Sequence, residues 1–461
     1  MKFLKSSEMD LTTGSIAKKM ILFAIPVILS GWLQLLYSAA DLITCGNFGS
    51  HNSVGAISAT SSLISLIVSL FIGLSVGSNV LMSMAFGAKQ HERAERIIGN
   101  SYAIAIISGL ILAIIGTTCS RYFLIWMGTP DEILDLANVY MTIYFAGIPF
   151  TIIYDFGSAL MRGLGDTTKP FIFLAISGAI NVGLNFLFVI TFKMDVAGVA
   201  TTTVIAQVIS AFLVTFSLIK NEHGFACLRW KYLRFRKEET IQILKIGIPS
   251  GIQSALFSLS NVVLQSSINS FGADAVTGTG AESSIESFLS TAVDGLSQGA
   301  VAFAGANYGA KNVRRIKQSA LWSTIDGIIV AGVLGIIVYF IPEPLLRIYI
   351  SDPDAISYGV EKLKLIGETY TIYAVVCTVS SAIRGLGYSI TPMIISLLGI
   401  CVLRIAYIYT IFPLPEFHTI TGLYYSYPLS WIVTAVAHII CYFLISRREF
   451  RKLEQDKSVK A

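Results

Sequence analysis

Charged residues are scarce in this sequence. Asp, Glu, Lys and Arg make up only 13% of the 461 residues, whereas a soluble domain of this size carries about twice that share. This shortage excludes an ordinary soluble protein, whose surface is built largely from charged side chains. Hydrophobic residues take their place at 54%, and the mean hydropathy is +0.70. The composition therefore predicts a polytopic membrane protein.

Residue patterns typical of metal, disulfide or covalent chemistry are also missing. The six cysteines contain no C-x-x-C pair and mostly fall in apolar runs, so we interpret them as small core residues. The five histidines are scattered, and the chain has no phosphate-binding loop and no nucleophile–base arrangement. We therefore expect neither an enzyme nor a cofactor. The polar, basic N-terminal segment leads directly into a long apolar run, so we expect no cleavable signal peptide.

Apolar runs long enough to cross a bilayer recur twelve times, each of about 20 residues or more. Because the bilayer core offers no water to backbone polar groups, each run is expected to be a helix. The predicted spans are 16–46, 53–86, 96–119, 135–160, 170–191, 196–219, 240–269, 276–308, 316–341, 357–383, 391–412 and 421–446. The fold class is therefore an all-α polytopic membrane protein with twelve transmembrane helices.

The distribution of Lys and Arg predicts how the chain is oriented. With the N-terminus inside, 27 of the 33 Lys and Arg residues lie in cytoplasmic segments, five lie outside, and Arg404 lies within a span. The five external residues include Lys362 at the start of the tenth span. Cytoplasmic loops of membrane proteins carry an excess of these residues. We therefore expect both termini to be cytoplasmic.

The sequence repeats itself at an offset of 222 or 223 residues. The matching pairs are Ile25-Pro26 with Ile248-Pro249, Phe48-Gly49 with Phe271-Gly272, Phe86–Lys89 with Tyr308–Lys311, and Arg162–Gly165 with Arg384–Gly387. Because each half holds an even number of spans, the halves are parallel repeats in the same orientation. We expect an N-lobe over 1–219, a cytoplasmic linker over 220–239, a C-lobe over 240–446 and a cytoplasmic tail over 447–461.

The first span carries a carboxylate, Asp41, and an amide, Gln34. An acid within a membrane helix costs about 2.5 kcal/mol or more on insertion scales, so it is by default a candidate functional residue. The alternative is that Asp41 lies at the helix end, where headgroups or a capping interaction satisfy it. Position alone leaves both open.

Taken together, these features resemble the multidrug and toxic compound extrusion (MATE) transporters of the MOP superfamily, and bacterial DinF-like members more than NorM-like ones. The motifs that carry the resemblance are Pro26 with Gln34 and Asp41, then Gly46–Gly49, Phe86–Lys89, and Met161–Thr167 with Pro170. The resemblance implies two lobes in a V shape within the plasma membrane. It also implies antiport of small organic cations or amphipaths against H⁺ or Na⁺, by a protein that we expect to be a monomer without a nucleic-acid partner.

The resemblance further implies a cation site in the N-lobe, whose positions match Asp41, Asn181, Asn185 and Thr203. Asp41, Asn185 and Thr203 lie roughly 8–10 Å from the outer ends of their helices at about 1.5 Å per residue. Oxygen ligands of this kind suit Na⁺ or a proton, although amides in membrane helices also serve as interhelical hydrogen-bonding groups. Asn185 departs from the family pattern, which has a second acid there. A single carboxylate favours proton coupling over Na⁺ coupling.

Further acids and aromatic residues are candidates for a substrate cavity. Gln34 and Tyr37 share the first span with Asp41. Asp155 lies deeper, about 10 Å from the cytoplasmic end of its helix, and either faces the cavity or pairs with nearby Arg162. Either alternative keeps the acid from facing lipid without a partner.

In the C-lobe, the eighth span carries Glu282, Glu286 and Asp294 at spacings that place them on one broad helix face. Such a face cannot point at lipid. NorM-like relatives keep acids on the seventh and tenth helices. Here the interior of the seventh span holds only amides and hydroxyls among its polar residues, and the tenth carries Glu368 near its outer part but no acid by Arg384. We therefore assign Glu282 and Glu286 to the cavity from burial cost alone. The alternative is a buried pair, for which Arg404 is the expected partner.

An alternative function is the flipping of a lipid-linked oligosaccharide, which is carried out by proteins with a related two-lobe fold. Such proteins usually carry several cavity arginines to hold the pyrophosphate. Here Arg96 stands at the very start of the span 96–119, so Arg404 is the one arginine in the interior of a predicted span. This difference favours the efflux function. The sequence does not identify the substrate.

Overall fold

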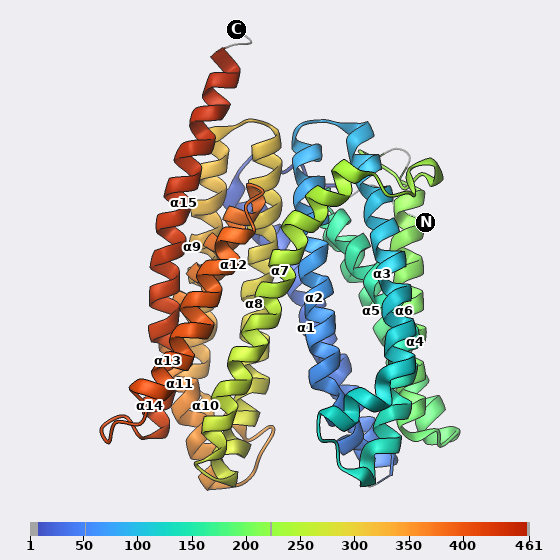
Figure 1. Cartoon of the computed structure of the whole chain (residues 1–461), viewed down its shortest axis with the longest axis vertical. Helices are drawn as coiled ribbons and strands as arrows, with labels where there is room; N and C mark the ends of the chain where they lie inside the picture. The colour runs from blue at the N-terminus through green and yellow to red at the C-terminus, as the bar shows by residue number, and fades with distance from the viewer. Residues whose placement is uncertain (1–7, 51, 222–223, 459–461) are drawn as a thin grey trace. The chain divides into compact units, whose positions relative to one another are not determined.

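The structure is a computed structural model that describes residues 8–50, 52–221 and 224–458 (Figure 1). Within these ranges every regular element is a helix, and no strand occurs. The long helices are α1 (Ile16–Phe48), α2 (Ser53–Gly87), α3 (His91–Trp126), α4 (Asp131–Gly163), α5 (Thr168–Asn185), α6 (Asp195–Ile219), α7 (Lys237–Asn269), α8 (Ala273–Gly309), α9 (Val313–Phe340), α11 (Pro353–Gly385) and α15 (Ser426–Ser458). This confirms the predicted all-α class.

The remaining helices are short. Two π-helical segments, η2 (Phe186–Thr191) and η4 (Leu397–Val402), follow α5 and α12 (Ile390–Ser396), and α13 (Leu403–Thr410) continues from η4. Short helices η3 (Trp230–Tyr232), α10 (Pro342–Leu346) and α14 (Ile420–Tyr424) lie between longer elements. Helix α10 begins at Pro342, since proline is well tolerated in the first turn of a helix.

Ten helical segments in the described ranges are long and apolar enough to cross a membrane. Helices α7 and α8, with 33 and 37 residues, are also long enough. They fall outside that set because they are more polar than the ten. Helix α8, for example, carries four acids, Asp274, Glu282, Glu286 and Asp294. Together these segments coincide with the twelve predicted spans, with shifts at their ends. The chain is therefore a multi-pass membrane protein.

The sequence repeat is also a repeat of backbone conformation. Lys89 and its counterpart Lys311 both follow a helix and have φ of 56° and 54°. Gly165 and its counterpart Gly387 have φ of 82° and 90°. Non-glycine residues rarely adopt the left-handed region, so the shared conformation at both lysines indicates that equivalent turns end equivalent helices.

The chain forms two compact units. Unit 1 consists of the described part of residues 1–10 with 29–251, and unit 2 consists of 11–28 with 252–461 as far as described. The divisions fall inside α1 and α7, and the segment 220–239 belongs to unit 1. The lobe boundaries expected from the sequence, at 219 and 240, stay a prediction.

Unit 1 is organised around α4, which packs against α2, α3 and α6. Glycines on α4 permit the close approach to α6, since an added Cβ at Gly147 or Gly157 would meet the side chain of Val204 or Val214. Small residues at helix contacts are typical of membrane proteins, where close packing replaces the hydrophobic effect.

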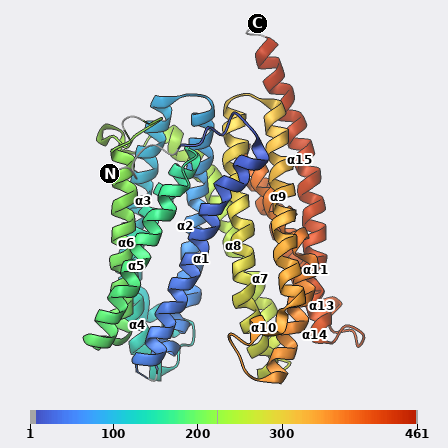
Figure 2. The ribbon, with the colours of Figure 1, turned by 180° about the vertical axis from the view of Figure 1, so that it is seen from behind.

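Unit 2 is organised around α11, which packs against α8, α9 and α15. Its core includes the fully buried rings of Tyr370, Tyr424 and Trp431. Helix α15 extends beyond the ends of its neighbours in this unit (Figures 1 and 2). These contacts fix the faces of α8 and α11 that carry the charged residues described below.

Candidate functional sites

The first candidate site surrounds Asp41 in unit 1. Asn185, the last residue of α5, donates from Nδ2 to Oδ1 of Asp41 at 2.6 Å, and Thr203 on α6 donates from Oγ1 to Oδ2 at 3.1 Å. Each carboxylate oxygen therefore accepts a hydrogen bond from a different helix. The structure brings together α1, α5 and α6 at this carboxylate, and Asp41 is not a helix cap.

A second layer of amides and hydroxyls surrounds these contacts. The Nδ2 of Asn185 lies 3.5 Å from Oδ1 of Asn181, and the Nδ2 of Asn181 lies 3.5 Å from Oγ1 of Thr203. Both asparagines are buried. All four residues that the sequence grouped are thus connected in one network.

Thr202 is a member of this network that the sequence analysis missed. Its Oγ1 lies 2.5 Å from Oδ1 of Asn185 and 2.9 Å from the backbone oxygen of Val199, and the shorter contact is the one to Asn185. The signal was the run Thr201–Thr203, in which the three hydroxyls point around α6 in different directions. Thr201 instead bonds to the backbone oxygen of Ala197 at 2.7 Å. Because Thr202 holds the amide oxygen of Asn185, the amide nitrogen faces Asp41.

This orientation bears on the choice of ion. A Na⁺ site needs several oxygen atoms directed at the ion, whereas Asp41 faces the nitrogen of Asn185 and the hydroxyl of Thr203. A Na⁺ ion bound at Asp41 would require the Asn185 amide to turn over. No group of three or more His, Cys, Asp or Glu residues able to hold a metal occurs in the described ranges. In the orientation seen here, both groups that contact the Asp41 carboxylate donate hydrogen bonds to it.

Gln34 and Tyr37 occupy different surroundings on α1. The side chain of Gln34 is exposed in the structure. Tyr37 donates from Oη to the backbone oxygen of Ala175 on α5 at 3.4 Å, and its ring fills the space where a Cβ on Gly178 would lie. Tyr37 thus forms a contact between α1 and α5, at residues of α5 that precede Asn181 and Asn185 in the chain.

Asp155 lies on α4 in unit 1, apart from the Asp41 network. It is half-buried, and its Oδ2 has no hydrogen-bond partner in the described part of the chain. Arg162, two turns further along α4, contributes an electrostatic interaction, but the described residues show no ion pair between the two within 4 Å. Asp155 therefore keeps an unsatisfied carboxylate oxygen.

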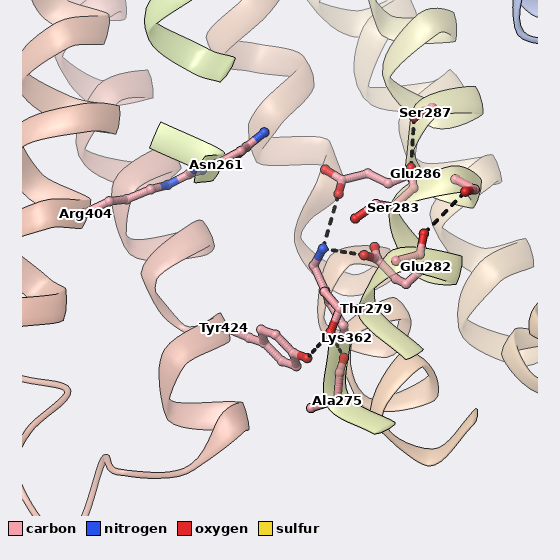
Figure 3. A network of polar contacts seen from close by, with 12 residues as sticks. Asn261, Ala275, Thr279, Glu282, Ser283, Glu286, Ser287, Lys362, Arg404 and Tyr424 are labelled. Atoms are coloured by element: carbon pink, nitrogen blue, oxygen red, sulfur yellow. Dashed lines mark hydrogen bonds and ion pairs between the residues drawn. The ribbon is translucent and has the colours of Figure 1, made fainter. Parts of the chain in front are cut away.

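The second candidate site lies in unit 2 and contains Glu282 and Glu286 on α8. The ammonium group of Lys362, on α11, forms an ion pair with Glu282 and lies 3.7 Å from Oε2 of Glu286 (Figure 3). The side chains of Lys362 and Glu282 are 2% and 0% exposed, whereas that of Glu286 is 23% exposed. One lysine is thus shared between two carboxylates.

The expectation that Arg404 pairs with these acids is wrong, because Lys362 is the partner. From the sequence, Lys362 was expected outside the membrane because it lies near the start of a predicted span. In the structure α11 begins at Pro353, so Lys362 lies well inside the helix, on the face that packs against α8. A lysine near a span end can be either a topology signal or a buried charge, and only the packing distinguishes the two.

Arg404 lies on α13, directly after the π-helical segment η4. Its Nε donates to Oγ of Ser430 at 2.9 Å and its Nη1 to Oδ1 of Asn261 at 3.4 Å. Its guanidinium lies 4.3 Å from the ring centroid of Tyr427. Within the described residues no acid lies at ion-pair distance from Arg404, so neutral groups and an aromatic face hold this cation.

The third acid of α8, Asp294, lies away from this network. It is exposed in the structure, and its charged neighbour is Arg384 at the end of α11. The three acids predicted on one broad helix face therefore lie in two different environments. Glu282 and Glu286 lie around Lys362, and Asp294 lies near Arg384.

A cavity of about 270 Å³ adjoins this second site. Its lining includes the charged groups of Glu286, Lys362 and Arg404 and the rings of Tyr373, Tyr427 and Trp431. Amide groups and hydroxyl groups from α7 and α8 complete it. The arrangement can bind a small polar molecule that also has an aromatic or apolar part.

Comparisons with known proteins agree with this architecture. The family model described as MatE matches residues 26–187 and again residues 249–410, at the offset of the sequence repeat. A "Probable multidrug resistance protein YoeA" of Bacillus subtilis is 26% identical over 426 residues, which cover 91% of this chain and 92% of that protein. A "Probable multidrug resistance protein NorM" of Thermotoga maritima is 26% identical over 400 residues, covering 85% and 84%.

Solved structures resemble the whole chain. The "Crystal structure of MATE in complex with MaL6" superposes with a TM-score of 0.89 at 20% identity and covers 98% of this chain and 100% of that one. An "Outward-facing conformation of a multidrug resistance MATE family transporter of the MOP superfamily" also gives 0.89, at 19% identity, with coverage of 98% and 99%. At these identities the likeness establishes the fold.

Proposed function

Because the chain belongs to the MATE family, we propose that it is a secondary antiporter that exports cationic or amphipathic organic molecules and takes up protons in exchange. The observation that carries this proposal is the Asp41 carboxylate, which accepts hydrogen bonds from α5 and α6 inside a membrane helix. The names of the relatives, which are multidrug resistance proteins, support the substrate class.

The proton is the proposed coupling ion because of how Asp41 is surrounded. Its neighbours Asn185 and Thr203 are neutral hydrogen-bond donors, so they supply no positive charge to balance the carboxylate. A charged carboxylate within a membrane helix is costly, and binding a proton removes that charge. Na⁺ remains the alternative, and it requires the Asn185 amide to reorient.

Proton binding changes the contacts between helices in this proposal. A proton on Oδ1 of Asp41 makes that oxygen a poorer acceptor for Nδ2 of Asn185, whose own oxygen accepts from Thr202. The protonated state therefore has a weaker contact between α1 and α5 unless the amide turns over. A ligand shifts a conformational equilibrium only by binding two states differently, and this change in contacts supplies such a difference.

In unit 2 we assign Glu286 to substrate binding and Glu282 to a structural pair with Lys362. Glu286 is the more exposed of the two acids and lines the cavity. Asp155 is assigned to a separate cavity position in unit 1, because one of its carboxylate oxygens is unsatisfied. The protein works as a monomer in the plasma membrane with both termini cytoplasmic, and alternates between inward-open and outward-open states.

The proposal is tested by transport into inverted membrane vesicles, with pH and Na⁺ gradients imposed separately. We expect a pH gradient alone to drive uptake of a fluorescent organic cation by the wild-type protein. Uptake driven by a Na⁺ gradient at equal pH, without uptake under a pH gradient, would show that Na⁺ is the coupling ion. Absence of uptake under both gradients would contradict the antiporter function itself.

A further inference from the structure

The cavity of unit 2 presents two charges of opposite sign that do not pair with each other. On one side, Lys362 contacts both glutamates and lies closer to Glu282 (Figure 3). Glu286 is the one of the two that lines the cavity. Since the charge of Lys362 is matched by Glu282, Glu286 is the negative group that a ligand can contact.

Arg404 is the positive group. It is 3% exposed and lines the same cavity. Arginine has five N–H donors, and its hydrogen bonds here go to Ser430 and Asn261, both neutral. An arginine held without an acid among the described residues is suited to bind an anionic group in two-point geometry.

We propose that this cavity binds a small zwitterion, with its anionic group, such as a carboxylate, on Arg404 and its amine on Glu286. This proposal rests on the proposed export function and specifies the substrate class of the unit 2 site. The ligand spans the cavity from α13 to α8, the elements that carry the two groups.

The charge balance of the site favours this class of ligand. Glu282, Glu286, Lys362 and Arg404 sum to zero when all four are ionised. A zwitterion leaves this sum unchanged, whereas a singly charged cation or anion leaves one unbalanced charge within the membrane. A zwitterion also gives Arg404 a counter-charge, and it gives Glu286 one in addition to the Lys362 that it shares with Glu282.

The aromatic wall and the size of the cavity specify the rest of the ligand. Trp431 packs against Tyr373 and Tyr427 with ring centroids 5.3 and 5.8 Å apart. Tyr427 also contacts both cations, since Lys362 and Arg404 lie 5.3 and 4.3 Å from its centroid. A volume of about 270 Å³ lies just below the usual range for drug-sized ligands. The ligand is therefore comparable in size to an aromatic amino acid.

The test compares three probes of one shape with different charge: tryptophan, its cationic methyl ester and its anionic N-acetyl derivative. Binding to purified protein in lipid nanodiscs is measured by isothermal titration. We expect the wild-type protein to bind tryptophan at least tenfold more tightly than either derivative. The Arg404→Gln variant should lose the preference over the ester, and Glu286→Gln should lose the preference over the N-acetyl form.

Two controls separate this proposal from the export function. The Asp41→Asn variant, altered in unit 1, should keep the binding preference for tryptophan while losing transport of an organic cation driven by pH. Arg404→Lys keeps the charge without the planar donor pair and should retain part of the preference, provided that size-exclusion profiles show folded protein. Three outcomes would overturn the zwitterion site. The first is equal binding of all three probes, and the second is survival of the preference in both charge-removing variants. The third is no binding of tryptophan by wild-type protein that transports the cation.

Discussion

Lys362 on α11 and Glu282 on α8 form an ion pair that is almost completely removed from the surface of the protein. Removing one member of such a pair leaves an uncompensated buried charge, which typically costs about 3–5 kcal/mol. We therefore expect Lys362→Met alone to destabilise the protein by about that amount. The double variant Lys362→Met with Glu282→Gln should recover most of the loss, because it removes both charges.

A matched control for this prediction is available in the same unit. Arg347 and Glu343 form an ion pair at 2.7 Å, but their side chains are 58% and 55% exposed. An exposed pair contributes about 0–1 kcal/mol, so Arg347→Met should be nearly neutral. Thermal unfolding in detergent measures all variants. Equal effects at the two pairs would mean that Lys362 and Glu282 are in contact with water.

Asp41→Asn is expected to abolish transport driven by a pH gradient while leaving the amount of folded protein unchanged. The amide oxygen can still accept the hydrogen bond from Thr203, but the side chain no longer binds a proton. Uptake in inverted vesicles measures the effect. Asp135→Asn serves as the control, because that acid is exposed and pairs with Arg121 at 2.7 Å. Undiminished transport by Asp41→Asn would remove this residue from the coupling mechanism.

Asn185→Asp is expected to increase the dependence of transport on Na⁺. The substitution places a second carboxylate in direct contact with Asp41, and two acids with nearby oxygens provide the charge that a hard cation requires. Transport rates at fixed pH with increasing Na⁺ measure the effect against the wild-type protein. If the response to Na⁺ is the same in both, the ion does not bind at this position.

Thr202→Val is expected to weaken proton-coupled transport and to destabilise the protein by about 1–3 kcal/mol, because it leaves the buried oxygen of Asn185 without its donor. The amide of Asn185 is then free to turn over, so the pH dependence of transport should shift. Thr201→Val is the matched control, since that hydroxyl bonds only to the backbone of its own helix. A shift in pH dependence of the same size in both variants would show that Thr202 does not orient Asn185.

The orientation of the chain is tested by cysteine labelling. A cysteine introduced at Arg234, in the segment 220–239, should react with a membrane-impermeant reagent only after the cells are opened. One introduced at Glu132, before the fourth predicted span, should react in intact cells. Both positions are exposed in unit 1. The reverse pattern would invert the topology and would place Asp41 near the cytoplasmic side.

The sequence by itself determined the number and approximate bounds of the membrane helices. The bilayer forces every long apolar run to satisfy its backbone groups internally, so length and hydropathy are sufficient. It also determined the repeat, since equivalent residues such as Lys89 and Lys311 recur at a constant offset and adopt the same backbone conformation. The grouping of Asp41 with Asn185 and Thr203 followed from family resemblance together with similar depth.

Only the tertiary structure decided which polar groups meet. Lys362 was counted as an external residue because it lies near the start of a predicted span. Its position along the span gave no information on which face of α11 carries it. Packing of α11 on α8 buries Lys362 beside Glu282. Arg404 instead contacts the ring of Tyr427 and donates a hydrogen bond to Ser430. The orientation of the Asn185 amide likewise depends on Thr202 from another helix. Charge pairing and amide orientation depend on contacts within a few ångströms between distant segments, and neither hydropathy nor spacing along one helix specifies them.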